Sequence, residues 1–153
     1  MHDLATFPSD VRRWLEPVPP ELLTKPPAAG GLALVENAWH LADLEVEGYG
    51  VRLRRLLAET SPALPDFQGD VIARERDYLH LPLGPALDRF ERARAENLAL
   101  IQAATDADRL RTGEQEGVGM VTFERVVAMM AEHDASHAEE IAALRRELGI
   151  SPP

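Results

Sequence analysis

Two histidines four residues apart form the most informative pair in this sequence. His133 and His137 lie in the run EHDASHAEEI, within a segment whose apolar residues recur at helical spacing. A spacing of four places both imidazoles on one face of a helix, one turn apart, and this arrangement suits two ligands of a single metal ion. His40, in the run NAWHLADLE, is a third candidate. If the fold brings His40 near the pair, the chain carries a three-histidine site with open coordination positions.

The helix that carries the pair has an interrupted apolar stripe. The positions of this stripe follow one another at alternating intervals of four and three residues. They are Phe123, Val127, Met130, Asp134, His137, Ile141, Leu144 and Leu148. Asp134 and His137 are polar where their neighbours in the pattern are apolar. Burial of a polar group costs free energy unless the group is paired or bound to a metal. The spacing alone leaves both explanations open: metal ligands, or polar residues satisfied by hydrogen bonds.

Other polar residues near the candidate ligands have possible roles in orienting a ligand or transferring a proton. These candidates are Glu36, Asp43 and Asp134. Arg94 falls on the stripe of another predicted helix, where it would either bind a carboxylate or phosphate of a substrate or form an interior salt bridge.

Some histidine patterns are excluded or set aside. The run HDASH is not the metalloprotease motif, because Asp134 stands where that motif has its glutamate general base. His2 and His80 are expected to be incidental, the first near the terminus and the second in a loop.

Length and composition limit the classes of protein to which this chain can belong. A chain of 153 residues predicts one domain that spans residues 1–153. The formal net charge of -10 disfavours binding to nucleic acids or to anionic membranes. The absence of cysteine excludes disulfides, thiolate metal sites and a protein thiol nucleophile. No apolar run reaches the roughly 18–20 residues of a membrane span, so we expect a soluble, cytoplasmic protein.

Proline and glycine divide the chain into helical segments. A short helix capped by Ser9 or Asp10 is expected before the first proline cluster. A long amphipathic helix is expected over residues 32–58, with a kink or a close helix contact at Gly48 and Gly50.

The second half of the chain continues this pattern. A helical turn or two is expected at 71–79, a third long helix at 82–104, and a loop at 106–119. The last helix is expected to be capped by Thr122 and to run to residue 148. No strand alternation is evident, so the predicted fold class is all-α, a four-helix bundle.

Four sequence runs carry a resemblance to a known family. They are AWHLADLE, RERDYLHLPLGPALDRFERAR, VTFERVVAMMAEH and HDASHAEEI, in this order along the chain. Together they make the sequence resemble the DinB/YfiT-like family of bacterial metal-binding four-helix proteins, in its DinB-like branch. The resemblance covers nearly the whole chain. One departure is Leu32-Ala33 after Gly30-Gly31, where the family often has Trp-Ser.

The resemblance implies a four-helix bundle with a divalent metal, zinc or nickel, held by His40, His133 and His137. Members of the family are associated with stress or DNA-damage induction, with hydrolase activity and, in related branches, with thiol S-transfer. Dimers are frequent among them, so the resemblance also implies a homodimer.

Two functional hypotheses follow. The first is a metal-dependent enzyme, a hydrolase or a thiol S-transferase, in which the metal lowers the pKa of a bound water or thiol. Because the chain has no cysteine, a thiol would enter as a small-molecule cofactor beside a small-molecule substrate. The alternative is a non-catalytic stress-response or interaction protein with a structural or sensory metal. A fourth protein ligand would favour the alternative, and a bound water would favour the enzyme.

Overall fold

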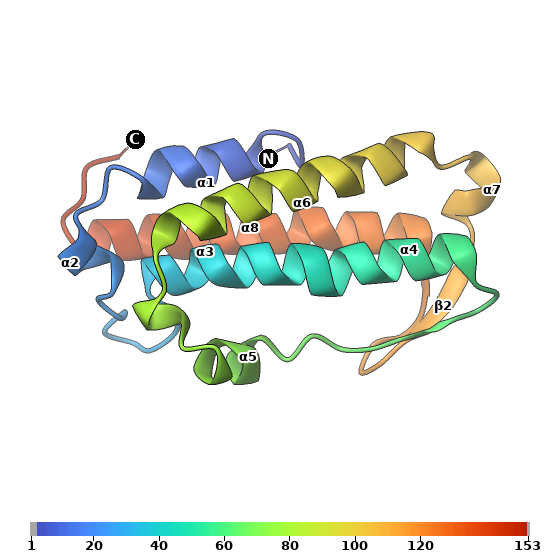
Figure 1. Cartoon of the computed structure of the whole chain (residues 1–153), viewed down its shortest axis with the longest axis horizontal. Coiled ribbons are helices and arrows are strands. Elements are labelled where there is room, and N and C mark those ends of the chain that lie inside the picture. Colours follow the sequence, from blue (N-terminus) through green and yellow to red (C-terminus); the bar gives the residue numbers. More distant parts are fainter. Residues whose placement is uncertain (1–2, 153) are drawn as a thin grey trace.

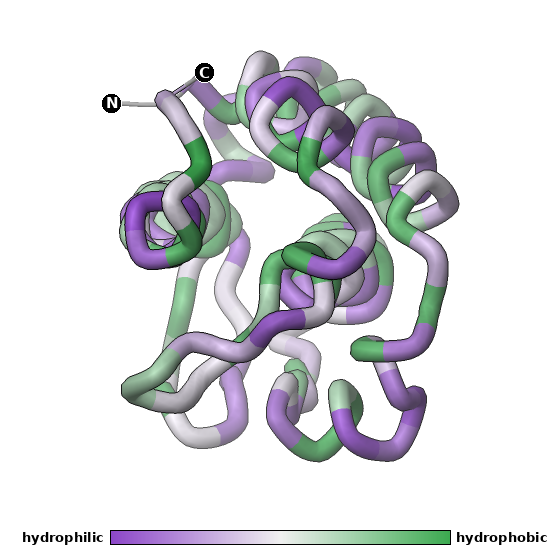
Figure 2. Tube along the Cα trace, turned by 90° about the vertical axis from the view of Figure 1, so that its left-hand side faces the viewer, coloured by the Kyte–Doolittle hydropathy of each residue, from purple (hydrophilic) through white to green (hydrophobic). Residues whose placement is uncertain are grey.

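Four helices packed side by side form the body of the molecule. The structure, a computed structural model, describes residues 3–152, so His2 lies outside the described residues. The helices are α1 (Phe7–Leu15), the long helix that starts as α3 (Leu34–Asp43) and ends as α4 (Val51–Ala58), α6 (Leu83–Ala103) and α8 (Phe123–Glu147). They follow the long axis in Figure 1, and Figure 2 views them nearly end-on. The predicted four-helix bundle is confirmed.

Short helices occupy the connections between the four long ones. They are α2 (Pro20–Leu23), α5 (Gly69–Glu75), the 3-10 helix η2 (Tyr78–His80) and α7 (Asp106–Arg109). The helical turns expected at 71–79 are therefore present as α5 and η2. No helix within residues 3–152 combines the length and the apolar character needed to cross a membrane.

The prediction of no strands, with a loop at 106–119, is wrong. Besides α7, this region contains β2 (Thr112–Gln115) and the start of β3 (Gly119–Thr122), which form an antiparallel hairpin. β1 (Ala63–Leu64) pairs with β2 in parallel. Strands of two to four residues are too short for apolar alternation to show in a sequence. The hairpin turn uses Gly117 and Gly119 at positive φ, a conformation that glycine adopts without steric cost.

The predicted start of the first helix is also wrong. α1 begins at Phe7, so Ser9 and Asp10 lie inside its first turn and do not cap it. Pro8 suits that turn because the first amides of a helix need no intrahelical partner, and Phe7 is buried. The prediction for the last helix is confirmed, since the Thr122 hydroxyl accepts a hydrogen bond from the backbone amide of Arg125.

The long helix changes from α-helical to π-helical geometry in the stretch that contains its two glycines. Residues Leu44–Gly50 form the π-helical stretch η1 between α3 and α4. The backbone carbonyl of Glu45 accepts a hydrogen bond from the Asn97 side chain at 2.9 Å. A Cβ on Gly50 would lie 3.1 Å from Asn97 Oδ1 and 3.0 Å from that carbonyl. The kink or close contact expected near Gly48 and Gly50 is present as this stretch, in which α6 approaches the helix backbone.

Two apolar clusters fill the bundle, one toward each end. The first joins α1 to residues on α3, α6 and α8 such as Leu41, Phe90 and Ile141. The second joins η1 and α4 to residues such as Ile101 and Met130. Between them lies a layer of buried polar side chains, which includes Glu45, Arg94, Asn97, Asp134 and His137. This polar layer contains the candidate site.

Candidate metal centre

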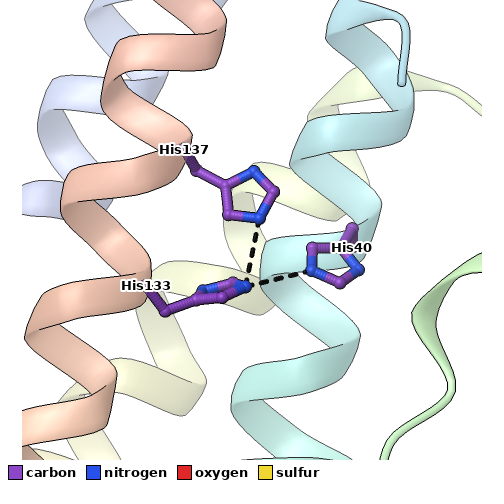
Figure 3. Close-up of side chains that lie close together, drawn as sticks. All are labelled: His40, His133 and His137. Atoms are coloured by element: carbon purple, nitrogen blue, oxygen red, sulfur yellow. Dashed lines mark hydrogen bonds between the residues drawn. The ribbon is translucent and has the colours of Figure 1, made fainter. Parts of the chain in front are cut away.

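The structure brings the three predicted histidines together. α3 supplies His40, and adjacent turns of α8 supply His133 and His137. His133 Nε2 lies 3.2 Å from His40 Nε2 and 3.0 Å from His137 Nε2. One ligand atom from each residue lies within 4.8 Å of the others. Figure 3 shows the three rings turned toward one another across the space between the two helices.

These separations fit ligands of one ion. With metal–nitrogen bonds of about 2.0–2.1 Å, neighbouring nitrogens lie about 3.3 Å apart in a tetrahedral site and about 2.9 Å apart in an octahedral one. The separations of 3.0 and 3.2 Å fall within this range. Within residues 3–152, the group contains no aspartate, glutamate or fourth histidine. Three imidazoles suit zinc, nickel, copper and iron.

Burial keeps the three imidazoles neutral. It lowers the pKa of His40 and of His137 to about 4, with the charge of His137 contributing at His40. Burial, with the charges of His137 and His40, lowers the pKa of His133 to about 2. A neutral imidazole offers one unprotonated nitrogen, which is the form that binds a metal.

Asn37 determines which nitrogen of His137 carries the proton. The Asn37 amide nitrogen donates to the backbone carbonyls of Leu32 and Ala33, so its Oδ1 is left as an acceptor. That oxygen lies 2.8 Å from His137 Nδ1. Nδ1 therefore carries the hydrogen and donates it, and the lone pair of His137 is on Nε2, which faces His133. Asn37 acts as a positioning residue for His137.

His40 is positioned by close packing. Its Nδ1 is buried and has no hydrogen-bond partner among the described residues. A Cβ on Gly69 would lie 2.7 Å from His40 Cε1 and 2.9 Å from Nδ1. Glycine at position 69 therefore lets the start of α5 cover the imidazole edge that faces away from His133, and any larger residue would displace the ring.

A cavity of about 590 Å³ opens on this cluster. His40 and His137 contribute to its wall, and so do the carboxylates Asp70, Glu140 and Glu147. The remaining wall comes from the Pro- and Gly-rich loop at 27–32 and from the last turns of α8. The cavity gives a small molecule access to His40 and His137, and His133 lies behind them in the cluster.

Comparison with known proteins identifies the family. The model of the DinB superfamily matches residues 3–141, which is most of the chain. The chain belongs to the DinB superfamily. The resemblance seen in the sequence is confirmed.

Relatives of this DinB-superfamily chain carry names that refer to metals. One from Geobacillus kaustophilus, named as a candidate metal-dependent hydrolase, is 29% identical over 144 residues, 94% of this chain and 80% of the relative. One from Geobacillus thermodenitrificans with the same kind of name is 28% identical over 130 residues, 84% of this chain and 72% of the relative. The solved structure of YfiT from Bacillus subtilis, described as a candidate metal-dependent hydrolase with an unusual four-helix bundle topology, superposes with a TM-score of 0.89 at 22% identity, over 97% of this chain and 85% of that one.

Arg94 and Asp134 form a buried ion-pair network with Glu45. The Arg94 guanidinium makes two hydrogen bonds to Glu45, both at 2.9 Å, and two to Asp134, at 2.7 and 3.0 Å. Asn97 donates to Glu45 as well. The interior salt bridge considered for Arg94 is therefore present. These pairs occupy the Arg94 guanidinium and the Asp134 carboxylate, so the structure favours the salt bridge over the other roles considered for the two residues.

Glu36 and Asp43 also have structural roles. A Glu36 carboxylate oxygen accepts a hydrogen bond from the backbone amide of Ala33 at the start of α3. Asp43 accepts hydrogen bonds from Arg76, Arg89 and the Tyr78 hydroxyl. These hydrogen bonds go to groups other than the candidate ligands, so they lend no support to the roles at the site considered for Glu36 and Asp43.

Sequence reasoning missed Asn37, Asp70 and Glu140. Glu140 Oε2 lies 3.2 Å from His137 Nδ1. Asn37 is a polar residue on the buried face of its helix, one turn before His40, and that position was a usable signal. Asp70 had no such signal, since only the folded loop brings it to the cavity.

His80 is exposed and contacts Asp77, as expected for an incidental histidine.

The stability of the metal-free protein should fall on mild acidification. Histidines in the unfolded chain have a pKa near 6.5, whereas burial lowers the pKa of His40 and His137 to about 4. Between these values the unfolded chain binds more protons, so the free energy of unfolding falls as pH falls, by up to about 1.4 kcal/mol per pH unit for each histidine. Urea unfolding at pH 7 and pH 5 measures this. Equal free energies at both pH values would contradict buried, neutral imidazoles.

Replacing Asn37 with alanine should weaken metal binding without abolishing it. Loss of the acceptor for His137 Nδ1 leaves the ring free to rotate and to protonate on Nε2, and losses of this kind cost roughly 10–100-fold in affinity. Chelator competition with purified protein measures the affinity. Glu139→Gln, an exposed change on α8 at a residue that lines a different cavity, is the control and should bind as the native chain does. Equal affinities in the two variants would contradict the role of Asn37.

Proposed function

We propose that this protein is a metal-dependent hydrolase of small molecules, with a divalent ion held by the Nε2 atoms of His40, His133 and His137. One observation carries the proposal: three neutral imidazoles, two of them half-buried and one buried, converge beside a cavity whose wall includes His40 and His137. Because the group includes no fourth side chain from residues 3–152, an ion bound there keeps a position for water or substrate. The names of the two Geobacillus relatives also support a metal-dependent hydrolase activity.

When bound, such an ion lowers the pKa of a water to near neutral and polarises a carbonyl. The chain's own residues supply the remaining requirements. Asn37 fixes the His137 ring, and Gly69 allows α5 to pack on His40. Asp70 and Glu140 add two carboxylates to the wall of the cavity, and one proton of the attacking water leaves with the departing group. In the net reaction, the water oxygen bonds to the carbonyl carbon while the bond to the leaving group breaks.

Several finer expectations stay predictions. Three imidazoles suit either zinc or nickel, so the identity of the ion rests on the family resemblance. The homodimer, the link to stress or DNA damage, the cytoplasmic location and the lack of nucleic-acid binding likewise stay predictions. Thiol S-transfer would use the same ion, with a small-molecule thiol in place of the water.

The test is a paired assay of purified protein in metal-loaded and chelated forms. The metal-loaded protein should hydrolyse members of a panel of esters and amides, chelation should abolish the activity, and added ion should restore it. Thiol conjugation to electrophiles is assayed in parallel. Metal-dependent conjugation without hydrolysis would overturn the hydrolase and favour the transferase. Absence of both activities in protein that binds its ion tightly would favour a structural or sensory metal.

A further inference from the structure

The cavity beside the three histidines is acidic. Three carboxylates, Asp70, Glu140 and Glu147, belong to its wall, and none of the wall residues within 3–152 is a lysine or an arginine. Glu147 already accepts a hydrogen bond from the backbone amide of Ala28, at 2.8 Å. This contact ties the loop at 27–32 to the last turn of α8 and leaves two carboxylates to meet a ligand.

Among residues 3–152, neither Asp70 nor Glu140 has a lysine or arginine partner. Asp70 is exposed, and its side chain makes no ion pair or hydrogen bond to any residue in the described part of the chain. Glu140 contacts two neutral groups, the Ser136 hydroxyl at 3.4 Å and His137 Nδ1 at 3.2 Å. Both carboxylates therefore keep an uncompensated negative charge beside the histidines.

The arginines that could recognise an anion lie elsewhere. Arg76, Arg89 and Arg92 line a different cavity, together with Trp39 and Tyr78. Two of the three are paired with Asp43 there. In the histidine cavity, a substrate with a phosphate or carboxylate would meet three carboxylates and no lysine or arginine among the wall residues within 3–152. The three carboxylates of that cavity outnumber the two positive charges of a divalent ion.

We infer that the histidine cavity takes a substrate with a protonated amine, held near Asp70 and Glu140 while its neutral acyl group lies at the three histidines. The inference rests on the proposed function, because the acyl group is placed by the metal centre. The apolar part of the wall, which includes Leu32, Ala143 and Leu144, packs against the carbon chain between the two ends. Attraction between an ammonium and exposed carboxylates raises affinity by up to about fivefold per pair.

Three hydroxamates that differ only in the charge of the chain end test the inference. They are the hydroxamates of γ-aminobutyric acid, pentanoic acid and glutaric acid, which share one metal-chelating group and end in a cation, a methyl group and an anion. Calorimetry with metal-loaded protein gives each dissociation constant. The cationic compound should bind about fivefold more tightly than the neutral one, and the anionic compound about fivefold more weakly.

Matched variants test which carboxylates cause the preference for the cationic compound. Asp70→Asn and Glu140→Gln should each reduce the preference for the cationic compound, and the double variant should remove it. Glu139→Gln is the control, because Glu139 is the sequence neighbour of Glu140 but lines another cavity with Trp14 and Ile150. It removes one charge and should leave the preference intact. Metal content is measured for each variant, so that a loss of the ion is not mistaken for a loss of recognition.

The outcomes separate the two proposals. Equal binding of all three hydroxamates, or tightest binding of the anionic one, overturns the amine inference and leaves the metal centre standing. A preference that Glu139→Gln removes as fully as the double variant also overturns it, since the effect would then come from net charge alone. Failure of all three compounds to bind protein that contains its ion overturns the open metal centre, and the inference falls with it.

Discussion

Replacing His137 with alanine is expected to reduce the metal content of the purified protein from about one ion per chain to near zero. The change removes one of three nitrogens, of which those of His40 and His137 lie 3.2 and 3.0 Å from His133 Nε2. Two imidazoles from different helices hold an ion far more weakly than three. Elemental analysis after dialysis against a weak chelator measures the content. His40→Ala and His133→Ala should behave in the same way.

His80→Ala is the matched control for these three variants. His80 is exposed and pairs with Asp77 in the 3-10 helix η2, so its loss removes an imidazole without touching the cluster. That variant should keep the native metal content. Equal metal content in His137→Ala and in the native chain, or a loss of the ion in His80→Ala, would contradict the assignment of the site.

Replacing Arg94 with methionine is expected to destabilise the fold by about 3–5 kcal/mol, the usual cost of breaking a buried ion pair by removing one partner. Arg94 is almost fully buried and is the cation that compensates both Glu45 and Asp134 in the polar layer. Without it, two buried carboxylates are left without their charge partner. Urea unfolding measures the change, and a variant too unstable to purify agrees with the same prediction.

Two further variants test the cause of that loss. Arg125→Ala breaks an exposed pair with Glu132 and should cost no more than about 1 kcal/mol. Combining Arg94→Met with Glu45→Gln and Asp134→Asn should recover part of the stability, because no buried charge then lacks a partner. A loss below 1 kcal/mol in Arg94→Met would contradict a structural role and return Arg94 to the list of candidate ligand-binding residues.

The candidate site was predictable from the sequence only in part. The spacing of His133 and His137 on one helix follows from helix geometry, but 93 residues separate His40 from His133. Nothing in the spacing joins them, and family resemblance supplied that link. Arg94 and Asp134 were visible as charged residues on the stripes of two predicted helices, but the sequence left Arg94 open between substrate binding and an interior salt bridge, and only the fold pairs it with Asp134.

The fold was predictable from the sequence where the apolar pattern extends over many residues. The helix that begins after Thr122 and the long helix over 32–58 carry many apolar repeats, and both are present. Strands β1, β2 and β3 have too few residues to show an alternation. The approach of Asp70 to the histidines depends on the path of the segment between α4 and α6, which local sequence does not determine.

A crystal structure of the metal-loaded protein, with anomalous scattering recorded at the absorption edge of the ion, would show directly whether the three histidines hold a metal. We expect one ion about 2.0–2.2 Å from the Nε2 atoms of His40, His133 and His137, with at least one further position filled by water. An ion bound elsewhere, or closed off by a fourth protein side chain, would contradict a three-histidine catalytic centre.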